Sequence, residues 1–247
     1  MLVVGATGSI GRFVVAESLA AGYQTRALVR DPAQATRFPP GTQIVVGDLT
    51  DPDTLREAVA GVTEIVFTHG SHGGAQAAEQ VDYGAVRNVL KTLADPARVA
   101  LMTTIGVTKH TPGHDWKRRG ERLLRASGLP YTIVRPGWFD YNGTDQQRLM
   151  MLQGDTRWAS DPSDGVISRA QIAQVLVASL TSSAADRKTL ELVAEQGPAQ
   201  PDLDPLFAAL AADPAEALDA VLDRDNMPLH QEPAAVLADL NAIRRRL

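Results

Sequence analysis

The stretch Met1–Gly11, MLVVGATGSIG, decides the fold of this 247-residue chain. Four apolar residues suited to a buried strand lead into a turn that carries Gly5, Gly8 and Gly11, and helical periodicity follows over residues 10–21. Without Cβ atoms, the first two glycines allow a tight turn and close approach of backbone N–H groups to a pyrophosphate. The third glycine lets the helix pack against the strand, and the helix N-terminus adds partial positive charge. This stretch predicts a dinucleotide-binding turn.

Short apolar strands alternate with amphipathic helices along the first half of the chain. The strand-like segments are residues 1–4, 24–29, 43–46, 64–67, 98–102 and 131–134. The segments with helical periodicity are residues 10–21, 52–60, 76–94 and 115–127. This alternation implies right-handed βαβ units, and runs such as LVV and ALM suit strands buried on both faces. The sequence therefore predicts an α/β fold of the Rossmann type with a doubly wound parallel sheet.

The alternation loosens after residue 135. Ser168 and Gln171 have the spacing of a capping box, which predicts the start of a helix, and TLELV reads as one more strand. A Pro-containing connector then precedes an Ala- and Leu-rich remainder that we predict to be helical. We expect an NAD(P)-binding domain over 1–195, which includes the substrate loops, and a small C-terminal helical extension over 196–247 that packs on it as a lid.

The composition excludes several classes of protein. The sequence contains no cysteine, so disulfides, thiolate nucleophiles and cysteine-ligated zinc are excluded. A formal net charge of −5 gives no electrostatic reason to expect nucleic acid. No apolar run is long enough for a membrane span, and the strand at the N-terminus leaves no room for a signal peptide. We expect a cytoplasmic protein that binds a small-molecule substrate, with a homodimer as one possible assembly.

Charged residues after the second and third strands indicate which dinucleotide is bound. An NAD site usually ends its second strand with a carboxylate, whereas this strand ends at Arg30 and Asp31 comes only afterwards. A guanidinium suits a 2′-phosphate by charge and by its bidentate fork, and Arg12 could close on the same phosphate. The alternative for Arg30 is a solvated arginine in a turn. Asp48 lies where a carboxylate could meet the adenine amino group, and NADP(H) is expected ahead of NAD(H).

The order and spacing of several motifs resemble the atypical short-chain dehydrogenase/reductase superfamily, in the branch of NmrA-like regulators and flavin or biliverdin reductases. The motifs are GATGSIG, LVRDP, VVGDLTD, AVAGVTEIVF, VDYGAVRNVL and ASGLPYTIVRPG, and the likeness covers roughly residues 1–195. The resemblance implies that Thr68, His69 and Gly70 border the cofactor ribose, and that residues 117 and 136 meet the nicotinamide end. The full set of expected cofactor-binding residues is Gly5, Thr7, Gly8, Ser9, Ile10, Gly11, Arg12, Arg30, Asp48, Leu49, Thr68, His69, Gly70, Lys117 and Pro136.

The usual reaction of this superfamily depends on a tyrosine that the present sequence lacks. The tyrosine protonates the carbonyl oxygen, a lysine lowers its pKa, and a serine hydrogen-bonds the same oxygen. Lys117 is present and Thr103 or Thr104 takes the place of the serine, but Gly113 stands where the tyrosine belongs. A positioned acid contributes roughly 10²–10⁴ in rate, so ordinary carbonyl reduction is expected to be slow.

Two explanations leave hydride transfer open. Four of the five histidines fall in the two loops expected to flank the nicotinamide: His69, His72, His110 and His114. An imidazole can supply a proton near neutral pH, and His114, beside the vacant position, is the first candidate. In the second explanation a flavin or quinone accepts the hydride and solvent supplies the proton. The aromatic residues available for an apolar platform are Trp116, Trp138, Phe139 and Tyr141. The histidines could also be plain loop residues, and the aromatics plain packing.

Two further patterns predict little beyond structure. The clustered histidines and Asp115 offer metal donors, but no HExxH motif occurs and no metal site is expected. Arg118, Arg122 and Arg125 share a helix face at i, i+4 and i+7, and such a stripe is usually solvated surface. We therefore expect this face to be exposed and not to bind nucleic acid.

The leading functional hypothesis is an NADP(H)-dependent oxidoreductase that reduces a small conjugated acceptor such as a quinone, a flavin or a carbonyl compound. Lys117 and Thr104 would order the nicotinamide end, and His114 would supply the proton. The substrate is expected between the 68–75 loop, the 135–145 loop and the C-terminal helices. The alternative is a catalytically weak NADP(H)-binding redox sensor or regulatory protein. A sugar-nucleotide epimerase-like enzyme ranks last because it also needs the absent tyrosine.

Overall fold

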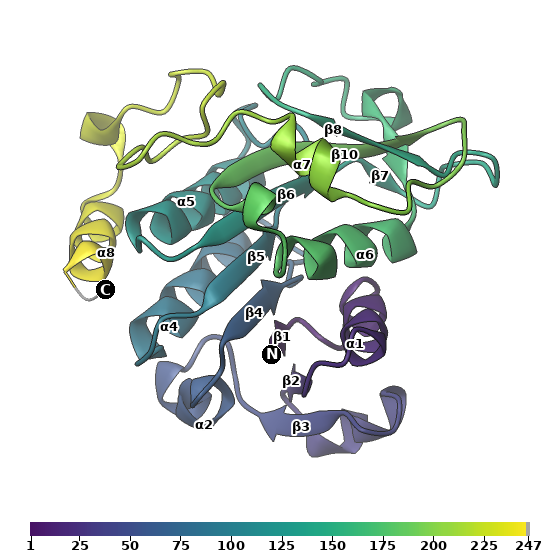
Figure 1. Ribbon diagram of the computed structural model, residues 1–247. Helices are drawn as coiled ribbons and strands as arrows, with labels where there is room; N and C mark the ends of the chain where they lie inside the picture. Colours follow the sequence, from purple (N-terminus) through teal and green to yellow (C-terminus); the bar gives the residue numbers. More distant parts are fainter. Residues whose placement is uncertain (246–247) are drawn as a thin grey trace.

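A parallel sheet forms the centre of the computed structural model, which describes residues 1–245 (Figure 1). Its strands are β1 (Leu2–Val4), β2 (Arg26–Val29), β3 (Gln43–Val46), β4 (Glu64–Phe67), β5 (Arg98–Met102), β6 (Tyr131–Pro136), β7 (Trp138–Phe139), β8 (Arg148–Leu152), β9 (Val166–Ile167) and β10 (Lys188–Glu195). Within the described residues their order is β3-β2-β1-β4-β5-β6-β10-β9-β7, and β8 pairs with β10 off this path. Every pairing from β3 to β10 along this order is parallel. The predicted Rossmann-type α/β fold is confirmed, and its strand order reverses between β1 and β4.

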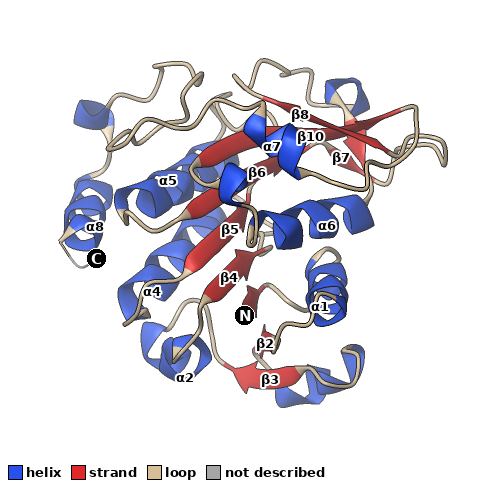
Figure 2. Cartoon of the chain, viewed as in Figure 1, coloured by secondary structure: helices blue, strands red, loops and turns tan. Residues whose placement is uncertain are grey.

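Helices cover both faces of the sheet (Figure 2). They are α1 (Gly11–Ala20), α2 (Arg56–Val59), α3 (Ala75–Ala77), α4 (Gly84–Thr92), α5 (Pro112–Ala126), α6 (Arg169–Ser179), α7 (Asp204–Ala208) and α8 (Ala234–Arg244). Short 3₁₀ turns occur at Pro32–Arg37, Pro52–Leu55, Pro162–Asp164, Ser183–Ala185 and Leu229–Gln231. Among residues 1–245, every helix falls short of the length and apolarity needed to span a bilayer.

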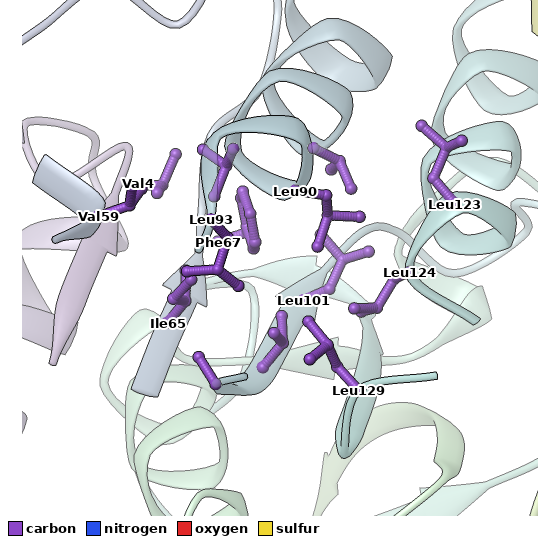
Figure 3. Close-up of a cluster of buried hydrophobic side chains, with 14 of the residues drawn as sticks. Val4, Val59, Ile65, Phe67, Leu90, Leu93, Leu101, Leu123, Leu124 and Leu129 are labelled. Carbon is purple, nitrogen blue, oxygen red and sulfur yellow. The ribbon is translucent and has the colours of Figure 1, made fainter. Parts of the chain in front are cut away.

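Side chains of the buried strands pack into two hydrophobic cores, one on each side of the sheet. In β4, Ile65 and Phe67 join the core under α4 and α5, while Val66 between them joins the core under α1 and α6. Successive strand side chains point to opposite faces, so a continuously apolar strand supplies both cores. Figure 3 shows the first core, where Leu90 from α4 and Leu124 from α5 lie against the sheet.

Two predicted helix boundaries have different outcomes. The capping box at α6 is confirmed, because the Ser168 hydroxyl accepts from the Gln171 backbone N–H and the Gln171 side chain accepts from the Ser168 N–H. The helix predicted over 76–94 is instead α3, a π-helical turn over Ala78–Tyr83, and α4. The widened turn directs Asp82 inward, to the site described below.

The chain after residue 195 is helical only in part. Helices α7 and α8 flank residues 209–233, which run mostly as irregular loop. Prolines recur through this part of the sequence and remove the N–H donors that a continuous helix needs. Helix α8 packs on the core beside α4 and α5 through Val236, Leu240 and Ile243.

The arginine face of α5 is buried, and the prediction of a solvated stripe was wrong. Arg118, Arg122 and Arg125 are 1%, 2% and 7% exposed. Arg118 and Arg122 both donate to Asp219 over 2.9 Å, and Arg125 donates to Asp213. These carboxylates lie about ninety to one hundred residues later in the chain, in the irregular C-terminal segment. Helical spacing alone gives no sign of partners so distant in sequence.

The arginines belong to a buried ionic cluster that joins α5, β6 and the C-terminal segment. Its cations are Arg118, Arg119, Arg122, Arg125 and Arg135. Its paired carboxylates are Glu121, Asp213, Asp219, Asp223 and Glu232. Glu191 also lies 3.8 Å from Arg135, and every arginine of the cluster has a carboxylate partner, so the buried charges compensate one another.

Candidate cofactor and substrate site

The glycine turn after β1 is built so tightly that its glycines cannot be replaced freely. A Cβ on Gly11 would lie 2.2 Å from the carbonyl oxygen of Gly5, and a Cβ on Gly5 would lie 2.6 Å from the backbone N of His69. Gly5 also has φ of +84°, which favours glycine. Gly8 is exposed at the mouth of the turn, beside the start of α1. The turn thus presents open backbone at a helix N-terminus, which suits a pyrophosphate.

The other predicted cofactor-binding residues in and next to this turn differ in their exposure. They are Thr7, Ser9, Ile10 and Arg12. Ile10 is buried under the turn, whereas Ser9 and Arg12 are exposed and Thr7 is half-buried. Arg12 is therefore open to solvent close to the backbone that would meet a phosphate. Ile10 serves the core beneath α1.

The residues after β2 and β3 lie next to one another at the same edge of the sheet. Arg30 follows β2 and is exposed, and among the described residues it forms no ion pair. Asp48 follows β3 and accepts hydrogen bonds from the Thr50 N–H and hydroxyl, which together with the nearby charge of Arg30 lower the pKa of the Asp48 carboxyl. Leu49 is half-buried, and its carbonyl accepts from Asn88. An exposed guanidinium at this edge fits a phosphate better than a ribose hydroxyl.

The segment after β4 contacts the glycine turn, as its sequence position suggests. The Thr68 hydroxyl donates to the Val4 carbonyl over 3.2 Å, and Gly70 is exposed beyond it. His69 is 7% exposed, and burial lowers the pKa of its imidazole to about 4. His69 is therefore neutral at pH 7 and poorly suited to supply a proton. Its Nε2 lies 3.2 Å from the Asp82 carbonyl, and its Nδ1 has no hydrogen-bond partner within residues 1–245.

Lys117 is held in an ion pair that sequence reasoning missed. Its Nζ lies 2.8 Å from Oδ1 of Asp82, which also accepts hydrogen bonds from the backbone and hydroxyl of Ser71. Burial alone would raise the pKa of Asp82, but the charge and hydrogen bond of Lys117 bring it below its usual value. Asp82 occurs in the quoted motif VDYGAVRNVL, and only its inward direction from the π-helical turn distinguishes it.

A larger cavity of about 490 Å³ lies beside the ends of β5 and β6. It brings together two of the three predicted catalytic residues, Thr104 and His114, with the predicted cofactor neighbour Pro136. Lys117 lines a separate, much smaller cavity with His69 and Asp82. Thr103 is buried and donates to Glu121 over 2.7 Å, so Thr104 is the threonine that faces the cavity.

The aromatic side chains divide between the cavity and the core. Trp138, Phe139 and Tyr141 line the cavity, and Trp138 and Tyr141 meet edge to face with centroids 6.1 Å apart. Trp116 instead packs against Tyr83 at 5.3 Å, next to the core, and does not line the cavity. Residues 157–169 supply further lining side chains, among them Arg157, Trp158 and Arg169, which sequence reasoning also missed.

Two expected parts of the substrate site do not line this cavity. None of its lining residues comes from the 68–75 loop or from the described part of the chain after Arg169. His72 is exposed in the first of these regions, and His110 is exposed where its imidazole lies 3.0 Å from Asp115 and 2.8 Å from the Asn226 carbonyl. The described part of the C-terminal segment packs along α5, and its predicted position over the substrate stays a prediction.

The loop that carries Thr104 is fixed by a buried carboxylate. Asp155 is fully buried, and it accepts hydrogen bonds of 2.6 Å from the N–H groups of Gly106 and Thr108. The hydroxyl of Thr108 donates to it as well, over 2.7 Å. Several charge-assisted hydrogen bonds to one buried carboxylate hold the loop in a single arrangement.

Gly113 leaves open space where a tyrosine side chain would begin. It lies in the first turn of α5, where the Thr111 hydroxyl caps the helix by accepting from the His114 N–H. Apart from its chain neighbours and the nearby backbone of α5, no atom among residues 1–245 lies within 4 Å of a Cβ built on Gly113. His114, the next residue, lines the cavity, and its Nδ1 lies 3.2 Å from the Lys109 carbonyl.

Comparison with known proteins agrees with this geometry. A family model described as NAD(P)H-binding matches residues 5–183. The chain is 30% identical over 205 residues to a photosystem II assembly factor, Ycf39, of Cyanophora paradoxa, which covers 78% of this chain and 63% of that protein. It is 25% identical over 254 residues to sanguinarine reductase of Eschscholzia californica, covering 83% of this chain and 92% of the relative. The chain thus spans less than two thirds of the assembly factor's length.

Solved structures show the same fold. A putative NAD-dependent epimerase/dehydratase from Bacillus halodurans superposes with a TM-score of 0.69 at 23% identity, covering 85% of this chain and 98% of the other. An NADPH-dependent quinone oxidoreductase of Escherichia coli, complexed with NADPH, superposes with a TM-score of 0.58 at 20% identity, covering 79% and 70%. The chain belongs to the NAD(P)H-binding family and has the Rossmann fold of these structures, in agreement with its predicted resemblance to the atypical short-chain dehydrogenases/reductases.

Proposed function

We propose that this protein is an NADPH-dependent reductase of flat conjugated acceptors, which bind in the 490 Å³ cavity. The observation that carries the proposal is the position of this aromatic-walled cavity beside Thr104 and Pro136, at the ends of β5 and β6. The glycine turn after β1 lies at the same edge of the same parallel sheet, and ligands of open α/β sheets bind at this edge. Reductases among its relatives support the reaction class.

The residues of the turn and the neighbouring strand ends fit the cofactor. Backbone groups of the turn with Gly5, Gly8 and Gly11 would bind the pyrophosphate. Cβ atoms on Gly5 and Gly11 would meet the protein's own backbone, so these glycines give the turn its tight shape. The exposed guanidiniums of Arg12 and Arg30 would bind a 2′-phosphate, which favours NADPH over NADH. The remaining proposed neighbours are Thr7, Ser9, Ile10, Asp48, Leu49, Thr68, His69, Gly70, Lys117 and Pro136. When bound, NADPH supplies the hydride.

The protein's own residues would order the nicotinamide end and complete the protonation. Lys117 would donate to the ribose hydroxyls while Asp82 fixes its ammonium group. Thr104 lines the cavity, and its hydroxyl, which donates to the Ile105 carbonyl over 3.2 Å, would turn to donate to an acceptor oxygen. His114 is the proposed proton donor, since it also lines the cavity and His69 is buried and neutral. Acceptors that are protonated by solvent would not need it.

The test is NADPH oxidation at neutral pH with a naphthoquinone, a free flavin and a simple ketone. We expect turnover of the conjugated acceptors, a clear preference for NADPH over NADH, and little with the ketone. His114→Ala should slow acceptors that need an acid by roughly 10²-fold or more. His230→Ala is the matched control, because His230 is exposed and does not line the cavity. Absence of turnover with every acceptor would overturn the proposal, whereas full activity of His114→Ala would overturn only the role of the histidine.

A second candidate is an NADPH-binding regulatory or assembly protein with little chemistry of its own. Gly113 in place of the tyrosine and the pairing of Lys117 with Asp82 favour it, as does the similarity to the Ycf39 assembly factor. NADPH binding without turnover of any acceptor would support this candidate.

Three broader proposals accompany these functions. Residues 1–195 would form the cofactor-binding unit and 196–247 an extension packed on it, supported by the family match that ends at residue 183. A cytoplasmic location stays a prediction, to be checked by fractionation. A homodimer also stays a prediction, to be checked by light scattering.

A further inference from the structure

The charged side chains that line the 490 Å³ cavity indicate which kind of ligand it binds. We propose that the cavity selects acceptors bearing an anionic group, a carboxylate or an equivalent oxyanion, attached to the aromatic ring system. The inference rests on the proposed function only in treating the cavity as the acceptor site. It concerns what the cavity binds, and it can be tested without any reaction.

Two cations of the cavity wall have no carboxylate partner. The Lys109 ammonium donates to the Trp158 carbonyl over 2.9 Å and to the Ser160 hydroxyl over 3.0 Å. Arg157 donates through Nη1 to the Asp164 backbone carbonyl over 3.0 Å. Neither side chain forms an ion pair anywhere in the described part of the chain. Uncharged carbonyl and hydroxyl oxygens thus hold these two side chains in place and leave their positive charges unbalanced.

The carboxylates closest to the cavity are already engaged. Asp164 accepts from the N–H groups of Ala159 and Ser160 over 2.8 and 2.7 Å. Asp140 forms an ion pair with Arg169, the third cation of the wall. The lining itself holds three cations, Lys109, Arg157 and Arg169, and one carboxylate, Asp164, while Asp140 outside the lining pairs with Arg169. A ligand with one negative charge would balance the wall, since cations partly removed from water are stabilised by an anion.

Unpartnered donors at the same wall point to an acceptor-rich ligand. Within residues 1–245, the indole Nε1 of Trp158 and the Nε of Arg169 are inaccessible and have no hydrogen-bond partner. A donor in this state costs free energy unless a ligand or water accepts from it. Elsewhere the protein satisfies its buried arginines, as the ionic cluster along α5 shows. Of the inaccessible, unpartnered polar atoms in the described residues, these two belong to side chains that line the cavity, whereas those of His69, Ser182 and Glu191 lie outside it.

The aromatic lining indicates what carries the anion. Trp138 is 36% exposed and Tyr141 is 64% exposed, although both are large apolar side chains. With Phe139 and Trp158 they offer flat surfaces that suit ring stacking. Arg224 stacks over the Trp158 ring at 4.0 Å and Arg169 over the Phe139 ring at 5.4 Å, so both rings are held in position. A fused or conjugated ring with one carboxylate matches both the surfaces and the charge.

The test compares two non-reducible ligands of the same shape by titration calorimetry on the full chain, with and without NADP⁺. The ligands are 2-naphthoate and neutral 2-naphthamide. We expect naphthoate to bind at least about tenfold more tightly, as one charge-assisted hydrogen bond predicts. Raising the ionic strength should weaken naphthoate binding and leave naphthamide binding unchanged.

Variants assign the preference to named residues. Lys109→Met and Arg157→Met should each reduce the naphthoate preference by about tenfold and leave naphthamide binding unchanged. Lys109→Arg should retain the preference, which separates loss of charge from loss of structure. Arg56→Gln is the control, because Arg56 is an exposed cation of α2 whose ion pair with Asp53 lies outside the cavity.

The outcomes separate this inference from the proposed function. Equal affinities for the two ligands, or equal losses of both in the methionine variants, would overturn the anionic specificity even if NADPH oxidation is observed. Selective naphthoate binding with no NADPH oxidation would overturn the reductase and leave the binding specificity standing.

Discussion

Two glycines of one turn should fail in different ways when alanine replaces them. A Cβ on Gly11 would lie 2.2 Å from the carbonyl oxygen of Gly5 and 2.8 Å from the Cα of Ala6. Both contacts are with backbone, so no side chain can move aside. Overpacking of this kind costs typically 1–3 kcal/mol and occasionally more, and we expect Gly11→Ala to lose about 3 kcal/mol of unfolding free energy.

Gly8→Ala should leave the fold nearly intact. Its Cβ would lie 3.1 Å from the Gly5 carbonyl oxygen, which is tight but not prohibitive, and Gly8 is exposed without a positive φ. The reduced freedom of the unfolded chain offsets part of the cost by about 0.4–1 kcal/mol. The methyl group would, however, stand where the backbone approaches the pyrophosphate. We expect NADPH affinity to fall at least tenfold, or about 1.4 kcal/mol.

The assay pairs urea unfolding, followed by circular dichroism, with titration of NADPH by its fluorescence. Gly113→Ala is the control, since its added Cβ would meet nothing within 4 Å among residues 1–245 apart from its chain neighbours and the nearby backbone of α5. We expect that variant to match the wild type in both measurements. The reasoning is refuted if Gly11→Ala unfolds at the wild-type urea concentration, or if Gly8→Ala binds NADPH as the wild type does.

Three further predictions follow from charged residues. Arg135→Met should lose about 3–5 kcal/mol of unfolding free energy in urea, because it leaves the buried Asp223 without its arginine and takes one of two arginines from the buried Glu121, whereas Arg56→Gln should lose less than about 1 kcal/mol. Arg30→Glu should weaken NADPH binding about tenfold or more in the fluorescence titration while NADH binding changes little, and an equal loss for both would contradict the phosphate contact. Burial raises the pKa of Glu191 to about 8 from 4.5, so the folded protein keeps this carboxyl protonated where the unfolded chain has lost the proton. The stability that the protonated Glu191 contributes is complete below pH 4.5 and declines as the pH rises toward 8. Between pH 6 and 8 the wild type should therefore lose roughly 2–3 kcal/mol more than Glu191→Gln, and parallel losses would show that Glu191 does not titrate there.

The elements fixed by local pattern could be predicted from the sequence. Strands buried on both faces, such as β4 and β5, are short apolar runs, and the capping box at Ser168 is a spacing of three residues. The short strands β7 and β9 were not predicted, because they are only two residues long and exist through pairing with each other and with β10. The same holds for the arginines of α5, whose burial depends on Asp219 and its neighbours far along the chain.

Some parts of the candidate site could likewise be predicted from the sequence, and others could not. The glycine turn is a contiguous motif, and its expected geometry follows from the missing Cβ atoms. Asp82, Asp155 and Arg157 come to the site only through the tertiary fold, and no short motif marks their role. A single sequence shows which residues could do chemistry, but contacts between distant segments determine which of them are free to do it.

The C-terminal segment has a mechanical role that differs from the expected lid. Its carboxylates bind the arginines on the side of α5, whose first two turns carry His114 and Lys117 at the two cavities. Arg118 follows Lys117 directly and is pinned by Asp219 and Asn226, over 2.9 and 2.5 Å. A rotation of α5 that moved Lys117 would also break these buried contacts, which are costly to leave unpaired. We therefore expect the segment to hold α5, and with it His114 and Lys117, in its present orientation. Loss of the segment should disturb the site, although it would remove no residue that lines the larger cavity.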